Sequence, residues 1–197
     1  MNLPNKLTVS RFVMTAVFLV VMFSRSPVND TLALVFFSIA SLTDYFDGKI
    51  ARDRKLITNF GILMDPLADK VLTCSAFIAL VERAQLSPTG VIVEAWMAIV
   101  IVARELAITG LRLLAASKGV TLAAERYGKH KTISQMVAII ALLVLDAHVE
   151  WWPWLKGFFN PWVSPFAQLA LWVTVTLTAT SGALYLHRNR EVYLNDM

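Results

Sequence analysis

Charged residues and cysteines are both scarce in this sequence. Only 16% of the 197 residues are charged, whereas a soluble domain of this length usually carries about a quarter. The single cysteine, Cys74, excludes a disulfide within the chain and leaves no thiolate cluster for a zinc ion. Because no Ser/Gly-rich linker, low-complexity tract or obvious repeat interrupts the sequence, we expect a single domain over residues 1–197.

Hydrophobic residues take the place of the missing charges. They make up 57% of the chain, and the mean hydropathy is +0.61. A run of about 20 apolar residues is long enough to cross a bilayer as a helix. Such runs predict an all-α integral membrane protein with six transmembrane helices, over residues 8–26, 31–51, 62–83, 90–115, 131–149 and 162–186.

Two segments outside these spans are expected to lie at the membrane surface. The start of the chain has no small-residue cleavage site after its first apolar run, so we expect it to stay on the protein. Asn5 and Thr8 are candidate helix caps there, which favours a short interfacial helix before the first span. The segment WWPWLKGFFNPW, at about residues 150–161, is expected to be an interfacial loop with an aromatic belt.

Basic residues are concentrated on one side of the predicted membrane. Three of the five connections contain only Arg25, Arg83 and Lys156. The two termini and the second and fourth connections contain eleven more: Lys6, Lys49, Arg52, Arg54, Lys55, Lys118, Arg126, Lys129, Lys131, Arg188 and Arg190. By the positive-inside rule, both termini and the second connection face the cytoplasm. We expect membrane lipids around the protein and no nucleic-acid partner.

Four aspartates fall close together in the cytoplasmic segment Thr43–Lys70. Asp44 and Asp47 are three residues apart at the end of the second predicted helix, so they share one face. Asp65 and Asp69 are four apart near the start of the third helix and also share a face. Because the connection between these helices returns the chain, the two pairs can meet across a helix–helix interface.

Converging carboxylates would repel one another and would be costly to desolvate. Divalent cations remove that cost, and oxygen ligands suit Mg²⁺, Mn²⁺ or Ca²⁺. Two such ions about 3.5–4 Å apart form a clamp suited to displacement at phosphorus. The alternative is that the aspartates reach the membrane surface and pair with Arg52, Arg54 and Lys55.

Small residues accompany the aspartates. Gly48 and Ala51 follow the first pair, and Gly61 precedes Asp65 by about one turn. Small residues in membrane helices permit close helix contact, and they equally permit a bulky ligand to approach the backbone. Arg52 adds a planar, permanently charged group that suits a phosphate.

The complete pattern is Asp-x2-Asp-Gly-x2-Ala-Arg-x8-Gly-x3-Asp-x3-Asp, with eight fixed residues over the 26 positions from Asp44 to Asp69. It resembles the signature of the CDP-alcohol phosphatidyltransferase family at every fixed position. The resemblance implies a six-helix membrane enzyme, usually a homodimer, in a bacterial inner membrane. Such an enzyme moves a phosphatidyl group from CDP-diacylglycerol to an alcohol at the cytoplasmic face and releases CMP.

The resemblance also implies roles for individual residues. Asp44, Asp47 and Asp65 would bind two divalent cations, expected to be Mg²⁺ with Mn²⁺ as the alternative. Asp69 would lie near the second ion and act as general base. The expected contacts to the cytidine diphosphate group come from Gly48, Ala51, Arg52 and Gly61, and from Asn5, Thr8 and Arg11 if the N-terminal segment folds over the site. Asn5 and Thr8 as ordinary caps, with Arg11 as an interfacial arginine, are the alternative.

Basic residues in the fourth and fifth predicted helices suggest an anionic acceptor. Arg104 and Arg112 lie within an apolar span, and Lys129 and Lys131 precede the next one. Charges inside a membrane helix are candidates for function. The alternatives are that neighbouring helices satisfy Arg104 and Glu105 and that the lysines merely follow the positive-inside rule. A direct Arg104–Glu105 pair is not expected, because sequence neighbours point in different directions on a helix.

Further landmarks resemble those bacterial members of the family that form phosphatidylglycerol phosphate, which implies sn-glycerol 3-phosphate as the acceptor. They are Pro4-Asn5-x-Leu7-Thr8-x2-Arg11, Thr43–Gly48, Met64–Lys70, Ala103-Arg104-Glu105 and Gly128-Lys129-x-Lys131-Thr132-x2-Gln135-Met136. The last third of the chain looks like generic membrane helix. Serine, phosphatidylglycerol and inositol phosphate remain alternative acceptors. A cation transporter is the alternative from another class, although no trail of acidic residues crosses the remaining helices.

Overall fold

The computed structural model describes residues 3–24, 28–53, 59–84, 93–120, 122 and 126–194. Within these ranges it describes the side chains of residues 9–24, 28–43, 67–68, 70–83, 93–120, 122 and 131–193. The regular elements in this part of the chain are all helices, with no strand among the described residues, which confirms the all-α prediction. Its elements are α1 (Leu3–Phe23), α2 (Asn29–Asp53), α3 (Asn59–Ala84), α4 (Ala95–Ser117), α5 (Arg126–Ala147), η1 (His148–Glu150), α6 (Pro153–Phe159), α7 (Val163–Arg188) and α8 (Arg190–Leu194).

The six long helices lie where the apolar runs predict them, but the two interfacial segments differ from expectation. The N-terminal segment forms no separate helix, since α1 runs without a break from Leu3 to Phe23. Pro4 does not interrupt it, because a proline in the first turn of a helix has no hydrogen bond to lose. The interfacial loop predicted near residues 150–161 contains the helical turn η1 and the short helix α6 instead.

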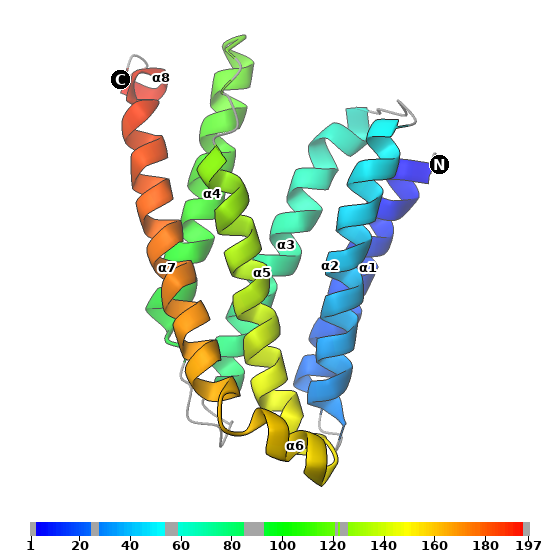
Figure 1. Cartoon of the computed structure of the whole chain (residues 1–197). Coiled ribbons are helices and arrows are strands. Elements are labelled where there is room, and N and C mark those ends of the chain that lie inside the picture. The colour runs from blue at the N-terminus through cyan, green and yellow to red at the C-terminus, as the bar shows by residue number, and fades with distance from the viewer. Residues whose placement is uncertain are drawn as a thin grey trace.

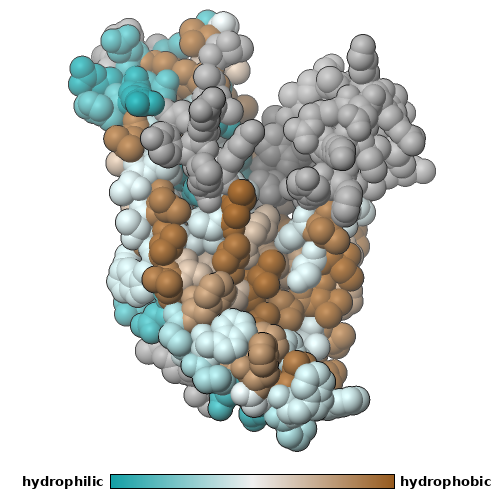
Figure 2. Space-filling model, in the orientation of Figure 1, coloured by the Kyte–Doolittle hydropathy of each residue, from teal (hydrophilic) through white to brown (hydrophobic). Residues whose placement is uncertain are grey.

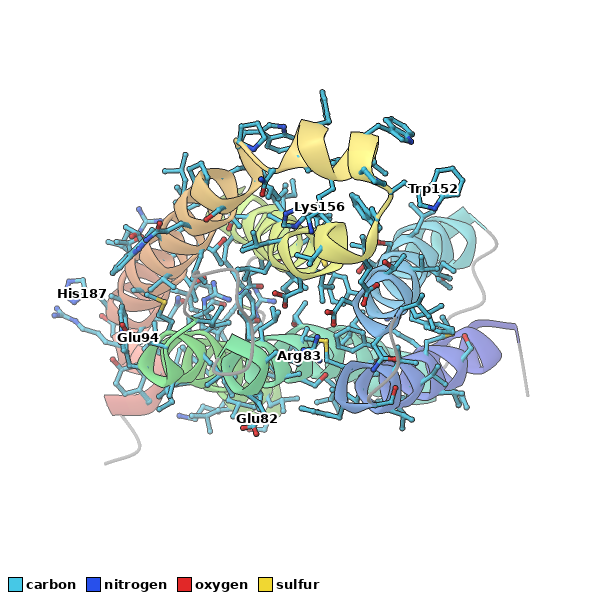
Figure 3. The ribbon with its side chains drawn as sticks, turned by 90° about the horizontal axis from the view of Figure 1, so that it is seen from below. Glu82, Arg83, Glu94, Trp152, Lys156 and His187 are labelled. Atoms are coloured by element: carbon cyan, nitrogen blue, oxygen red, sulfur yellow. The ribbon has the colours of Figure 1, made fainter. Side chains whose placement is uncertain are left out.

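The helix α6 forms because its sequence supplies both a start and a packing surface. Pro153 occupies the first turn, where its fixed φ angle favours helix. Phe159, at the other end, packs with ring centroids 5.1 Å from both Trp151 and Trp162. The helix lies across the lower end of the bundle (Figure 1). Trp152, directly before it, projects outward from the bundle (Figure 3). Trp152 and Trp154 are 75% and 70% exposed, as residues of an aromatic belt should be.

The long helices form one contiguous core. α1 packs against α2 and α3, and α7 packs against α4 and α5, while contacts between α2 and α5 and between α3 and α4 join the two groups. Large side chains at the centre, such as Phe18, Phe37 and Phe77, are fully buried. Phe18 and Phe37 meet with their ring centroids 5.6 Å apart. The bundle therefore places α7 against both α4 and α5.

The outside of the bundle is apolar where a membrane would surround it. Figure 2 shows hydrophobic residues over the middle of the molecule and hydrophilic residues toward the end that carries α8. Within the described residues, two segments have the length and hydropathy of a membrane span, Lys131–Glu150 and Val163–Arg188. Shorter apolar helical stretches cover Val9–Phe23 and Asn29–Thr43. Such a surface suits a lipid environment, because lipid chains offer no hydrogen-bond partners.

Glu150 caps the start of α2, although 119 residues separate it from Thr31. Its carboxylate accepts hydrogen bonds from the backbone amides of Asp30 and Thr31, both at 2.9 Å, and from the Thr31 hydroxyl at 2.6 Å. Arg83 at the end of α3 pairs with Asp30, and it points into the bundle while its neighbour Glu82 points away (Figure 3). This cluster joins three elements at the lower end of the molecule.

We expect Glu150→Gln to lower the free energy of unfolding by about 1–2 kcal/mol, the usual cost of losing a helix cap. In the variant, the NH₂ group of the glutamine would replace one accepting oxygen, so a hydrogen-bond donor would face the backbone N–H groups at the start of α2. Thermal denaturation in mild detergent, followed by circular dichroism, measures the loss. The matched control is Glu82→Gln, the same change at an exposed position near the same end. Equal losses in the two variants would contradict the capping role.

Candidate functional site

The aspartate segment occupies the facing ends of two consecutive helices. Asp44 and Asp47 belong to the second half of α2, and Asp65 and Asp69 to the first half of α3. These ends lie at the upper end of the bundle, together with the start of α1 and with α8 (Figure 1). The backbone thus brings both pairs to one end of the bundle (Figure 1), and their meeting across a helix–helix interface stays a prediction.

The side chains of the aspartate segment lie outside the described residues. This applies to Asp44, Asp47, Gly48, Ala51, Arg52, Gly61, Asp65 and Asp69, and equally to Asn5, Thr8 and Lys129. Among the side chains that are described, no group of three or more His, Cys, Asp or Glu residues could hold a metal ion. The metal site and the nucleotide contacts therefore stay predictions that rest on the aspartate pattern.

A buried charge cluster joins α4 and α5. Glu105 of α4 is 5% exposed, and Lys131 and Gln135 of α5 are 4% and 1% exposed. Lys131 forms an ion pair with Oε1 of Glu105. The same oxygen lies 3.2 Å from Nη1 of Arg104 and 3.5 Å from Nε2 of Gln135. Two of the three charged side chains in this cluster, Arg104 and Lys131, are basic.

The direct Arg104–Glu105 pair corrects an expectation from the sequence. The two Cα–Cβ bonds do point in different directions, but the long arginine side chain bends back to the carboxylate. Gly182 of α7 makes room for this, because a Cβ atom at that position would lie 2.7 Å from Cγ of Arg104. The close approach of α4 and α7 therefore decides where the guanidinium goes.

Arg112 is held by α7 in a different way. Its Nε donates to Oη of Tyr185 at 3.3 Å, and its Cζ lies 5.6 Å from the centroid of that ring. Tyr185 is only 3% exposed, whereas Arg112 is exposed. Arg112 comes seven positions after Glu105, so the two lie on nearly the same face of α4. An oriented but accessible guanidinium is suited to binding an anion.

The contribution of α7 was not predicted from the sequence, in which the last third of the chain looks like generic membrane helix. Thr174, Thr178, Gly182 and Tyr185 form a buried line of small or polar residues along that helix. Thr174 donates to the backbone oxygen of Ser134 in α5 at 2.8 Å. The spacing of these residues, which places them on one helical face, is the signal that would have identified them.

Arg11 also differs from a simple interfacial arginine. It lies on α1 and is 4% exposed, although the end of a helix at a membrane surface normally exposes such a side chain. Its backbone oxygen accepts a hydrogen bond from the Thr15 hydroxyl at 2.8 Å. Arg11 therefore belongs to the interior of the upper half of the bundle.

Residues 1–180 match the sequence profile of the CDP-alcohol phosphatidyltransferase family. The chain belongs to that family. The resemblance carried by the aspartate segment is thereby confirmed, and this CDP-alcohol phosphatidyltransferase is an enzyme of a membrane-associated phosphotransferase family.

Similar proteins cover nearly the whole enzyme. A CDP-diacylglycerol–glycerol-3-phosphate 3-phosphatidyltransferase from Bacillus subtilis is 42% identical over 202 residues, with 96% of each chain covered. The Rickettsia bellii protein of the same name is 33% identical and covers 98% of this chain and 97% of its own. A probable phosphatidylglycerophosphate synthase from Mycobacterium tuberculosis is 40% identical over 141 residues, which are 70% of this chain and 64% of its own.

The α5–α7 contact behind the charge cluster can be tested with two threonines of one helix. We expect Thr174→Val to lower the free energy of unfolding by about 0.6–1 kcal/mol, the usual range for a hydrogen bond between membrane helices. Thr176→Val is the control, because Thr176 is exposed on the same helix. Apparent melting temperatures in detergent compare the two. A larger loss in Thr176→Val would contradict the assignment of the packed face.

Proposed function

We propose that this enzyme transfers the phosphatidyl group of CDP-diacylglycerol to sn-glycerol 3-phosphate, giving phosphatidylglycerol phosphate and CMP. The observation that carries the proposal is the meeting of Arg104 and Lys131 at Glu105 between α4 and α5, with Arg112 oriented by Tyr185 on nearly the same face of α4. An acceptor with a phosphate group requires such a site, and serine does not require it. The names of the similar proteins support the same acceptor.

The aspartates would carry the transfer itself. The acceptor hydroxyl attacks the phosphorus that bears the diacylglycerol group, the bond from that phosphorus to the CMP oxygen breaks, and the hydroxyl proton passes to Asp69. Asp44, Asp47, Asp65 and Asp69 would hold two divalent cations, with Mg²⁺ favoured over Mn²⁺. When bound, these ions neutralise the negative charge that develops on the leaving CMP. Carboxylates at the ends of α2 and α3 are the oxygen ligands that such ions prefer.

The two substrates would occupy different parts of the upper end. Gly48, Ala51, Arg52 and Gly61, with Asn5 and Thr8 of α1, would bind the cytidine diphosphate group. Arg104, Arg112 and Lys131, with Lys129 close before Lys131 in the chain, would bind the acceptor's phosphate. The three basic side chains named here suit a phosphate dianion, because opposite charges attract strongly where water is largely excluded.

The six long helices would all cross the membrane as one domain, with the active site on the cytoplasmic side of a bacterial inner membrane. The distribution of basic residues supports this orientation. So does the position of the start of α1 and of α8 at the same end of the bundle (Figure 1). The proposed homodimer rests on the family resemblance alone, and the mass of the purified protein in detergent tests it.

The decisive experiment measures CMP release from CDP-diacylglycerol by purified protein in detergent with Mg²⁺. We expect release with sn-glycerol 3-phosphate and little with serine, which has no phosphate for the basic side chains to bind. We also expect little with inositol phosphate or phosphatidylglycerol, because the similar proteins are named for glycerol 3-phosphate. Release with another acceptor only would overturn the choice of acceptor. No release from folded protein, together with ion flux in vesicles, would favour the cation transporter.

Asp69→Asn should lower kcat by about 100-fold or more, since the attacking hydroxyl loses its general base. A chelator of divalent cations should stop CMP release by the unmodified enzyme, and added Mg²⁺ should restore it. The control is again Glu82→Gln, an exposed carboxylate far from the aspartate segment. Wild-type rates in Asp69→Asn would exclude this residue as the base.

A further inference from the structure

We propose that Glu105 and Gly182 are positioning residues, which hold Lys131 and Arg104 where the acceptor's phosphate binds. The inference rests on the proposed function and deepens it, because neither residue would touch the acceptor. Glu105 would act through its carboxylate, and Gly182 would act because it has no side chain and so leaves space for Arg104.

Glu105 is placed to orient two cations at once. One oxygen, Oε1, receives Lys131 from α5 and Arg104 from its own helix, and Gln135 contributes a third donor. A lysine side chain has four rotatable bonds and no preferred direction of its own. Buried contact with a fixed carboxylate removes that freedom before a ligand arrives, and such preorganisation improves binding.

Stability alone gives no reason for this cluster. The desolvation of a buried ion pair usually offsets most of its attraction, and well-packed apolar side chains in its place are often neutral or stabilising.

Gly182 decides the path of Arg104. A Cβ atom there would lie 2.7 Å from Cγ, 3.6 Å from Cβ and 3.8 Å from Cδ of the arginine. The stem of Arg104 therefore lies directly against the backbone of α7, and even a methyl group would push it away. Gly110 of α4 has no such role, because a Cβ atom added there would meet no atom of the described residues within 4 Å.

The test compares KM for sn-glycerol 3-phosphate, KM for CDP-diacylglycerol, kcat and the melting temperature. We expect Gly182→Ala to raise KM for sn-glycerol 3-phosphate about tenfold, as for loss of one oriented charged contact, and to leave KM for CDP-diacylglycerol within about twofold. Gly110→Ala, the control for the same substitution, should leave both constants unchanged. Wild-type KM values in Gly182→Ala would overturn the role of Gly182.

Glu105→Gln should raise the same KM and also destabilise the protein, because it leaves buried cations without their carboxylate. The double variant Glu105→Gln/Lys131→Met is compared with Lys131→Met alone, and this comparison remains informative if Glu105→Gln does not fold. Removing both charges should recover melting temperature, whereas KM for sn-glycerol 3-phosphate should rise above that of Lys131→Met, because Arg104 also loses its carboxylate. Equal KM values in these two variants would overturn the role of Glu105.

The unmodified enzyme tests the choice of acceptor, and the variants test the positioning roles. If sn-glycerol 3-phosphate is not the acceptor, the unmodified enzyme itself releases no CMP with it, and the inference falls with the proposed function. If only the positioning roles are wrong, the unmodified enzyme is active and the variants keep its KM.

Discussion

Charged side chains inside an apolar bundle must find partners within the protein, and the upper half of this molecule is arranged around that constraint. The Glu105 carboxylate is a partner of both Lys131 and Arg104, and thereby connects α4 and α5. Tyr185 contacts Arg112 with its hydroxyl group and with the face of its ring. Because lipid and packed apolar side chains offer no alternative partners, these contacts keep the cationic groups in defined positions instead of leaving them to fold back on the surface.

The two ends of the bundle use charge for different purposes. At the lower end, Glu150 satisfies the amides at the start of α2, and Arg83 pairs with Asp30, so each charge has a structural partner. The exposed side chains of Trp152 and Trp154, at the start of α6, lie at the same end. At the upper end, Arg104 of α4 and Lys131 of α5 meet at Glu105, and four aspartates lie on α2 and α3. A reaction between a lipid-linked nucleotide and a water-soluble phosphate fits at such an end, because both substrates reach it and both cations and anions are needed there.

The hydropathy of α7 does not reveal the small and polar residues with which this helix contacts α4 and α5. Its composition marks it as a membrane span, and nothing in its charge draws attention to it. Its buried face nevertheless supplies the hydroxyl of Thr174 to α5, the open space of Gly182 to Arg104, and Tyr185 to Arg112. These residues act through size and hydrogen bonding rather than charge, so only their helical spacing distinguishes them in the sequence.

The sequence by itself determined the positions of the six long helices and the family, because apolar runs of bilayer length and eight spaced residues are local properties of the chain. It also determined that the aspartates fall at the facing ends of two consecutive helices. Only the tertiary structure decided that Arg104 bends back to Glu105, that Lys131 joins them, and that Glu150 caps a helix more than a hundred residues away. Those contacts depend on which helices become neighbours and how closely they pack, and a sequence pattern within one helix carries no information about the partner that will face it.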